Sequence, residues 1–460
     1  MTNKEKVAIV LAAGIGKRMH SKVPKVLHKI CGREMVLYPI DAAKDAGFSK
    51  VVVVISDDIP KEIFNGVEVA YQKVPLGTGD AARAGLNAVK FFPDGASLLV
   101  LTGDNPLIKK EDIESLNAFF ENGKFDAVVL SAEAENPSGL GRIVRSGDAF
   151  VKIVEEKDAS ESEKQIKEIN TGIYIFKKSA LEEALLHLSN DNAQGEYYLT
   201  DTLYYLKAHG KSVGVKKMER ILPIYGVNTR KELAVATRII QSEILDKLML
   251  KGVTIINPET VSIDYGVEIE NDTVILPGCV IQGDTKIGSG CEIGPNARIV
   301  DAQIGSGTHI QFSVVLNSRI GENCEIGPFS YVRPGNELSN SVKIGTFVEI
   351  KKSKVAENSK IPHLSYIGDA TVGKNVNIGA GTITCNYSGL QGHVKNPTFI
   401  GDNVFIGSHS TLVAPVHIHN NAYTAAGSVI TKDVPEWTLA IGRSKQVNKE
   451  NWVKRRKGNG

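Results

Sequence analysis

Short apolar runs alternate with amphipathic stretches over the first half of the chain. The apolar runs have the length of buried strands and lie at residues 7–11, 51–55, 67–71, 98–102 and 128–131. The stretches with helical spacing lie at 36–46, 78–89 and 110–120. Alternation of strands and helices predicts an α/β domain with a mostly parallel sheet.

From about residue 251 the apolar positions recur every six residues. Isoleucine occupies seven successive positions of this period, from Ile263 to Ile299, and glycine often follows, as in Ile287-Gly288. A short fixed period predicts a solenoid, here a parallel β-helix in which three hexapeptides make one triangular coil. Strands of a β-sandwich also alternate apolar and polar residues, but they do not keep a strict period of six.

The two patterns divide the chain. We predict an α/β domain over 1–228, a connecting helix over 229–250 and a β-helix domain with a C-terminal tail over 251–460. The segment 231–250 has helical spacing and contains neither glycine nor proline. The hexapeptide period breaks near 333–343, 351–366 and 385–398, where we expect loops that carry functional residues.

Composition narrows the class of protein. The 460 residues carry a net charge of +2, no apolar run has the length of a membrane span, and five cysteines form no CxxC pair. The first residues lead into a strand-like run and are not typical of a signal peptide. We therefore expect a cytoplasmic protein with no membrane partner and no nucleic-acid partner.

A glycine-containing turn follows the first predicted strand. The small residues in Leu11-Ala12-Ala13-Gly14, two alanines and a glycine, let backbone N–H groups approach phosphates, and Arg18 and Lys25 add positive charge. Met19 stands where the dinucleotide-binding fingerprint needs its third glycine, and the segment is no Walker A loop. Phosphate binding by a helix N-terminus and an ordinary strand–helix turn both remain open.

Further motifs follow this turn in a fixed order. The segment 11–19 with Pro24-Lys25 resembles the signature of sugar-1-phosphate nucleotidylyltransferases. The later motifs are Leu76-Gly77-Thr78-Gly79, Gly103-Asp104, Gly139-Leu140-Gly141-Arg142, Glu155-Glu156-Lys157, Asn170-Thr171-Gly172 and Gly226-Val227-Asn228-Thr229. Together with the β-helix half, the whole chain resembles the family of bifunctional N-acetylglucosamine-1-phosphate uridylyltransferases / glucosamine-1-phosphate N-acetyltransferases.

The resemblance implies two reactions. Glucosamine-1-phosphate would be acetylated with acetyl-CoA, and the resulting N-acetylglucosamine-1-phosphate would be coupled to UTP with Mg²⁺, to give UDP-N-acetylglucosamine and pyrophosphate. It also implies that the β-helix is left-handed and that the protein is a homotrimer.

For nucleotidyl transfer, the resemblance assigns the metal to Asp104 and Asn228. A carboxylate and water suit Mg²⁺, which needs few protein ligands. Arg18 and Lys25 would neutralise the triphosphate in catalysis. The other implied contacts with the sugar nucleotide are Leu11, Ala12, Ala13, Gly14, Lys25, Gln72, Gly77, Thr78, Gly141, Glu155, Asn170 and Asn228.

For acetyl transfer, the resemblance assigns His363 as the base, and histidine titrates near neutrality. The implied contacts with the phosphorylated amino sugar are Arg333, Lys351, Tyr366, Asn377 and Asn386. The implied contacts with acetyl-CoA are Ala380, Asn386, Tyr387, Ser408, Ala426 and Arg443.

Several residues depart from the family pattern or have no assigned role. Lys17 stands where threonine is usual and is expected to face solvent, and Asn105 stands where valine is common. Lys395 matches a family lysine only across an unusually long loop at 388–398. Cys385 is expected to be a buried small apolar residue. The basic tail 454–457 is either solvated or reaches CoA phosphates or a neighbouring subunit.

Two other functions are compatible with parts of this pattern. A nucleotidylyltransferase with a purely structural or regulatory β-helix would not need the set His363, Tyr366, Asn377 and Asn386. A trimeric scaffold or sugar-binding module without catalysis would not need Lys25, Asp104 and Asn228. The two sets of residues therefore favour the bifunctional enzyme.

Overall fold

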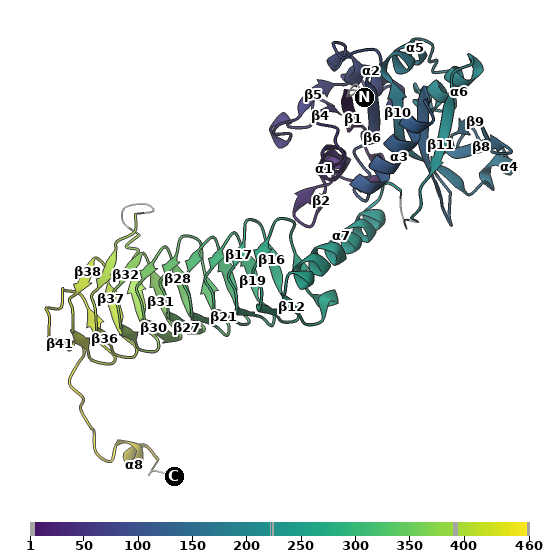
Figure 1. Ribbon diagram of the computed structural model, residues 1–460. Helices are drawn as coiled ribbons and strands as arrows, with labels where there is room; N and C mark the ends of the chain where they lie inside the picture. Colours follow the sequence, from purple (N-terminus) through teal and green to yellow (C-terminus); the bar gives the residue numbers. More distant parts are fainter. Residues whose placement is uncertain (1–4, 221, 223–224, 390–393, 458–460) are drawn as a thin grey trace. The chain divides into compact units, whose positions relative to one another are not determined.

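The computed structural model describes residues 5–220, 222, 225–389 and 394–457. Its contacts divide the chain into two compact units, Met1–Ile240 and Gln241–Gly460, which are described separately (Figure 1). The tip of the long loop predicted at 388–398, with His393, lies outside the described residues.

The N-terminal unit is built on a mixed nine-stranded sheet. Its main path runs β11-β7-β10-β6-β1-β4-β5, and β6, β1, β4 and β5 are parallel, as the alternating pattern predicts. These strands are β1 (Lys6–Leu11), β4 (Lys50–Ile55), β5 (Glu68–Tyr71), β6 (Ser97–Thr102), β7 (Ala127–Glu133), β10 (Glu168–Lys177) and β11 (Val213–Lys217). Strand β10 runs antiparallel to β6 and β7, and the antiparallel hairpin of β8 (Arg142–Ser146) and β9 (Ala149–Val154) joins it.

Helices cover both faces of this sheet (Figure 1). One face packs against α2 (Thr78–Ala88), α5 (Lys178–Leu186) and α6 (Thr200–Ala208), and the other packs against α1 (Leu37–Asp45) and α3 (Lys110–Asn122). Every second residue of β1, namely Val7, Ile9 and Leu11, belongs to the core on the α2 face. Successive side chains of a strand point to opposite faces, so a continuous apolar run supplies both cores.

Helix α7 (Arg230–Leu250) begins beside the last motif of the N-terminal unit. Thr229 and Glu232 bond reciprocally at its start: the Thr229 N–H donates to Oε2 of Glu232 at 2.8 Å, and the Glu232 N–H donates to Oγ1 of Thr229 at 3.2 Å. This is a capping box, which satisfies N–H groups that have no partner within the helix. The division between the two compact units falls inside α7, and the predicted domain bounds stay a prediction.

The C-terminal unit is a left-handed parallel β-helix with three sheets. The first sheet has 11 strands from β12 (Thr254–Ile255) to β41 (Leu439–Ala440), the second has 10 from β13 (Ser262–Ile263) to β40 (Val429–Ile430), and the third has nine from β14 (Glu268–Ile269) to β38 (Val416–Ile418). The predicted isoleucines pair directly on successive coils, as with Ile275, Ile293 and Ile310. All three are fully buried, so the six-residue period is the core of the coil.

Two of the three predicted breaks do not form loops. Strands β26 (Glu337–Leu338) and β29 (Lys354–Val355) continue the third sheet through 333–343 and 351–366. Leu338 and Val355 fill the inward position, so other aliphatic residues replaced isoleucine without breaking the coil. The third break is a loop between β34 (Ile383–Cys385) and β35 (Thr398–Ile400).

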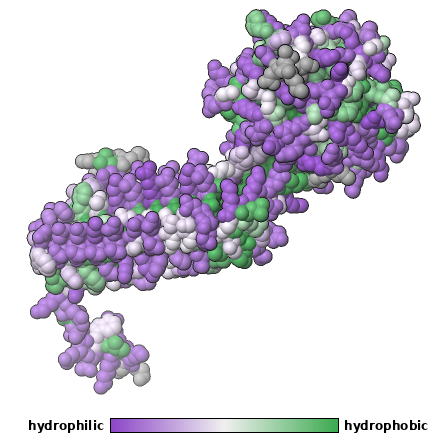
Figure 2. Space-filling view, viewed as in Figure 1, coloured by the Kyte–Doolittle hydropathy of each residue, from purple (hydrophilic) through white to green (hydrophobic). Residues whose placement is uncertain are grey.

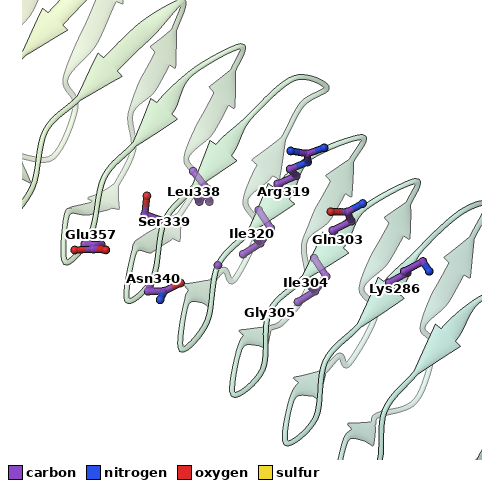
Figure 3. A pocket seen from close by; sticks show the side chains of 11 residues that line it. Lys286, Gln303, Ile304, Gly305, Arg319, Ile320, Leu338, Ser339, Asn340 and Glu357 are labelled. Carbon is purple, nitrogen blue, oxygen red and sulfur yellow. The ribbon is translucent and has the colours of Figure 1, made fainter.

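The surface of the β-helix repeats along its length. Figure 2 shows hydrophilic rows with a narrower pale and green row between them, as expected when like residues stack on successive coils. An open hollow of about 640 Å³ lies over the third sheet, and Gly305 and Gly321 are among the residues that line it (Figure 3). Its lining mixes Lys286 and Arg319 with Glu357, and it contains none of the predicted site residues.

Two candidate active sites

The turn after β1 brings the first predicted phosphate-binding residues to Lys25. Gly16 has a φ of +64°, and a Cβ there would lie 2.4 Å from the Cβ of Lys25, so only glycine fits. A 3-10 helix of three residues, Lys17–Met19, follows the turn. Of the two interpretations left open by the sequence, the structure therefore offers only a very short helix for anion binding, beside the backbone of the turn itself. Lys17 and Arg18 are exposed.

The predicted metal ligands and Lys25 meet at the carboxyl end of β6. The Nζ of Lys25 contacts Oδ2 of Asp104 and donates to Oδ1 of Asn228 at 3.1 Å. The N–H of Val227 donates to the carbonyl oxygen of Asp104 at 2.8 Å, so the two motifs are also joined through the backbone. Only 12% of the Lys25 side chain and 19% of the Asp104 side chain are exposed.

This cluster fits a Mg²⁺ ion. Burial acts to raise the pKa of Asp104, but the charge and hydrogen bond of Lys25 outweigh it, and the pKa lies below its usual value. Asp104 is therefore an anion that shares a cation with the amide oxygen of Asn228. Two hard oxygen ligands are what Mg²⁺ requires from a protein when phosphates and water supply the rest. Within the residues described, no three acidic, histidine or cysteine side chains form a metal-binding group.

The predicted uracil-binding residues lie between β5 and α2. Gln72 follows β5 and is buried, and its Nε2 donates to the carbonyl oxygen of Gly77 at 3.1 Å. The N–H of Tyr197 donates to the carbonyl oxygen of Leu76 at 2.8 Å, and the N–H of Gly79 donates to that of Tyr197 at 2.8 Å. The segment around Thr78 is therefore held at both ends.

The predicted sugar-binding residues come from three strands. Gly141 precedes β8, Glu155 follows β9 and Asn170 lies in β10, and the Asn170 N–H donates to the carbonyl oxygen of Gly141 at 2.8 Å. Burial raises the pKa of Glu155, and the nearby carboxylates Asp201 and Asp158 add to the increase.

Two side chains that the sequence analysis did not single out orient these sugar residues. The hydroxyl of Thr200 donates to Oε1 of Glu155 at 3.3 Å, and Nδ2 of Asn170 donates to the hydroxyl oxygen of Tyr174 at 2.7 Å. Thr200 is the first residue of α6, and Tyr174 lies two residues after the motif Asn170-Thr171-Gly172. Proximity to a motif could therefore have indicated Tyr174 but not Thr200.

In the C-terminal unit, the predicted base and three acetyl-CoA residues stack at one corner. His363 ends a strand of the first sheet, and Ala380, Ser408 and Ala426 each follow one. Backbone bonds link their coils: Gly381 N–H to His363 oxygen at 3.3 Å, His409 N–H to Ala380 oxygen at 2.7 Å, and Gly427 N–H to Ser408 oxygen at 2.8 Å. The ring of His363 is exposed and makes no hydrogen bond to any residue that the structure describes.

The other amino-sugar residues lie mainly on the second sheet. Arg333 and Lys351 occupy neighbouring coils, and Tyr366 is on the next. Nη1 of Arg333 is 2.8 Å from Oε1 of Glu349. Nδ2 of Asn386 donates to Oδ2 of Asp369 at 2.6 Å and to the hydroxyl of Tyr366 at 3.4 Å. The sequence assigned no role to Asp369, which lies three residues after Tyr366.

The remaining predicted residues lie apart from that group. Asn377 is on the first sheet, in β33 (Asn377–Ile378), whereas Tyr366 is on the second. Nζ of Lys395 lies 3.9 Å from the ring centroid of Tyr387, which brings the lysine of the long loop beside a predicted acetyl-CoA residue. Arg443 is exposed on the C-terminal tail.

Cys385 and Asn105 lie in different surroundings. Cys385 is exposed, so the prediction that it is buried is wrong; its place in β34 turns the side chain outward. Asn105 is 2% exposed, and its Oδ1 has no partner among the described residues. No helix in the described part of the chain is long and apolar enough to cross a membrane.

The two units define a nucleotidyltransferase joined to a hexapeptide-repeat transferase. Residues 8–201 match the MobA-like NTP transferase domain, and residues 266–300 and 397–432 match the bacterial transferase hexapeptide (six repeats). "Bifunctional protein GlmU" of Caldanaerobacter subterraneus subsp. tengcongensis is 51% identical over 98% of both chains. The proteins of that name from Carboxydothermus hydrogenoformans and Clostridioides difficile are 49% and 46% identical over 97% and 98% of this chain, and 99% and 97% of theirs.

The chain belongs to the family of bifunctional GlmU proteins. It is a bifunctional enzyme, with a nucleotidyltransferase domain followed by a hexapeptide-repeat transferase domain.

Proposed function

We propose that the C-terminal site acetylates glucosamine-1-phosphate with acetyl-CoA, and that the N-terminal site couples N-acetylglucosamine-1-phosphate to UTP with release of pyrophosphate. The observation that carries this proposal is the presence of two separate polar clusters, one around Asp104 and the other around Asn386 and Tyr366. UTP and acetyl-CoA are cytoplasmic metabolites, so we propose a cytoplasmic location.

In the N-terminal reaction, a phosphate oxygen of the sugar attacks the α-phosphorus of UTP and pyrophosphate leaves. The substrate is itself the nucleophile, so the enzyme contributes positioning and charge neutralisation. Asp104 and Asn228 would hold the Mg²⁺, which supplies positive charge to the phosphates when bound. The N–H of Ala12 donates to the carbonyl oxygen of Val54 at 2.8 Å. The backbone N–H groups of Ala13 and Gly14, with Arg18 and Lys25, would therefore bind the triphosphate.

In the C-terminal reaction, the amine of the sugar attacks the thioester carbonyl carbon and CoA leaves as a thiol. His363 removes a proton from the amine, and its exposed ring at the corner is free to do so. Arg333 and Lys351 bind the sugar phosphate, and Tyr366 and Asn386, tied to Asp369, orient the sugar.

We propose that three copies assemble through their β-helices. Phe312, Phe329 and Phe347 form a ladder at the corner that also carries His363, with ring centroids 5.5 Å apart and exposures of 37%, 54% and 59%. Their φ values of 44°, 60° and 57° lie in the left-handed region, which is costly for bulky residues, and burial of the rings against a neighbouring copy would offset part of that cost.

The chemistry of the other faces supports the same assembly. The third sheet carries the exposed ion pairs Glu268–Lys286 and Glu337–Lys354, which favour contact with water. Asn377 and Tyr366 lie on different sheets of adjacent coils, so the first sheet of one copy facing the second sheet of another would complete the acetyl-transfer site.

The Phe329→Glu protein is expected to be monomeric, because a charge replaces the middle ring of the ladder. Size-exclusion chromatography with light scattering would measure the mass. Loss of the trimer should lower the rate of thiol release, whereas the rate of pyrophosphate release should be retained. Asn323→Glu is the matched control, since Asn323 is exposed at another left-handed corner, with a φ of 53°. A trimeric Phe329→Glu protein would contradict the assembly.

Lys25→Met is expected to separate metal binding from catalysis. Removing the ammonium leaves Asp104 and Asn228 without their cation, so Mn²⁺ should bind the nucleotide-free protein more tightly in isothermal titration. Pyrophosphate release should fall by about 100-fold, since the positive charge of Lys25 no longer neutralises the triphosphate. Lys177→Met, which removes a lysine paired with Asp126 elsewhere on the sheet, is the control. Weaker Mn²⁺ binding by Lys25→Met would refute this role.

One assay on the unmodified protein tests the proposed function. The protein would receive glucosamine-1-phosphate, acetyl-CoA, UTP and Mg²⁺, with thiol and pyrophosphate followed separately. Release of both products is expected. Pyrophosphate release from N-acetylglucosamine-1-phosphate without any thiol release would instead identify a single-activity nucleotidylyltransferase with a structural β-helix.

A further inference from the structure

The side chain of Gln72 is held in one orientation by two acceptors. Its Nε2 donates to the carbonyl oxygen of Gly77 at 3.1 Å and to Oδ2 of Asp80 at 2.9 Å. A carbonyl oxygen and an ionised carboxylate can only accept hydrogen bonds. The amide therefore cannot be turned over without placing Oε1 against two acceptors. Both Nε2 hydrogens are used, which leaves Oε1 as the atom that a ligand can reach.

The two acceptors are themselves rigidly placed. Gly77 has a φ of +111°, and a Cβ there would lie 2.6 Å from the carbonyl oxygen of Tyr197, so its backbone is packed against that segment. Asp80 lies in the first turn of α2, and its Oδ1 is 3.6 Å from Nη1 of Arg83. Arg83 is held in turn by the carbonyl oxygen of Leu185, at 3.1 Å from Nη2.

An acceptor in a fixed position selects a base that offers a donor. Uracil carries a hydrogen on N3, whereas N3 of cytosine carries a lone pair and would face Oε1 with no hydrogen between them. A buried site built to bond an N–H group discriminates strongly against an analogue that lacks it, because its own polar atom then stays unpaired. Gln72 is only 5% exposed, so water can do little to replace a hydrogen bond that Oε1 fails to make.

We propose that Asp80 determines the choice of nucleotide. Its carboxylate fixes the orientation of the Gln72 amide, with Oε1 toward the base, and the enzyme thereby accepts UTP and rejects CTP. Asp80 acts through Gln72 and is a positioning residue. The inference rests on the proposed function, in which UTP is the substrate and its base lies at Gln72.

Replacing Asp80 with asparagine tests this directly. The new amide can present Nδ2 to Gln72, which lets the Gln72 amide turn over and offer Nε2 to the base. The ratio of kcat/KM for UTP to that for CTP, measured by pyrophosphate release, should fall by about tenfold, as expected for one misplaced hydrogen bond. The KM for N-acetylglucosamine-1-phosphate should not change, although a merely structural defect would affect both substrates.

Two control variants separate the amide contact from other roles of Asp80. Arg83→Gln removes the ion pair with Asp80 but leaves the acceptor, so the UTP preference should stay. Asp80→Glu retains a carboxylate and should keep more of the preference than Asp80→Asn. If Asp80→Asn melts earlier than the unmodified protein, Asp80→Ser, which suits the first turn of a helix, takes its place under the same criteria.

The outcomes distinguish this inference from the proposed function. If the unmodified protein releases no pyrophosphate from UTP, the proposed function is wrong. If it does, and a stable Asp80 variant retains the original UTP preference, the inference about Asp80 is wrong. A stable variant that is inactive with both nucleotides also overturns the inference, since Asp80 would then serve catalysis rather than selection.

Discussion

Asp104→Asn protein is expected to release pyrophosphate at least about 1000-fold more slowly than the unmodified enzyme, because the substitution removes the charge that holds both the metal and Lys25. The asparagine has the same shape, so the effect reports the lost charge. The measurement is pyrophosphate release from N-acetylglucosamine-1-phosphate, UTP and Mg²⁺.

Two comparisons show whether this loss is specific. Asp126→Asn removes an aspartate that also pairs with a lysine, at 2.7 Å, but lies outside the site, and it should retain pyrophosphate release. Thiol release by Asp104→Asn protein should be unchanged, because the acetyl-transfer residues lie in the other compact unit. Appreciable pyrophosphate release by a folded Asp104→Asn protein would remove Asp104 from the catalytic site.

His363→Ala protein is expected to lose thiol release by about 100- to 10,000-fold, the usual contribution of a general base. The exposed ring is not part of the β-helix core, so the melting temperature should be unaffected. Thiol release from acetyl-CoA and glucosamine-1-phosphate measures the effect. Pyrophosphate release from N-acetylglucosamine-1-phosphate and UTP should be retained.

His309 offers a matched control for that substitution. It is also exposed on a strand of the first sheet, β21 (His309–Ile310), three coils before the strand that ends at His363. His309→Ala should retain thiol release. Equal losses in the two variants would show that the assay reports damage to the β-helix rather than removal of a base.

The sequence predicted the β-helix well because the residues that recur every six positions are also the residues of its core. Each inward position needs one aliphatic side chain, so Ile275, Ile293 and Ile310 reveal both the coil and its register. The coils at Leu338 and Val355 were missed because leucine and valine replace isoleucine at the inward position there, and loops were expected instead. The antiparallel direction of β10 relative to β6 and β7 was not predicted, because a run of apolar residues does not indicate the direction of the neighbouring strands.

The candidate sites were predicted through motifs rather than through geometry. The pairing of Lys25 with Asn228 joins residues 203 positions apart, which no local pattern contains. The supporting residues Thr200 and Asp369 lacked a signal of their own, since single threonines and aspartates are common beside turns. Their roles became visible only through the hydrogen bonds to Glu155 and Asn386.

The central claim is that one chain carries two independent sites for consecutive reactions. Complementation tests it most directly: Asp104→Asn and His363→Ala proteins would be supplied separately and together with glucosamine-1-phosphate, acetyl-CoA, UTP and Mg²⁺, and UDP-N-acetylglucosamine would be measured. Neither protein alone should make the product, and the mixture should make it, since each retains the site that the other lacks. A mixture that makes no product, although both proteins are folded, would contradict the claim.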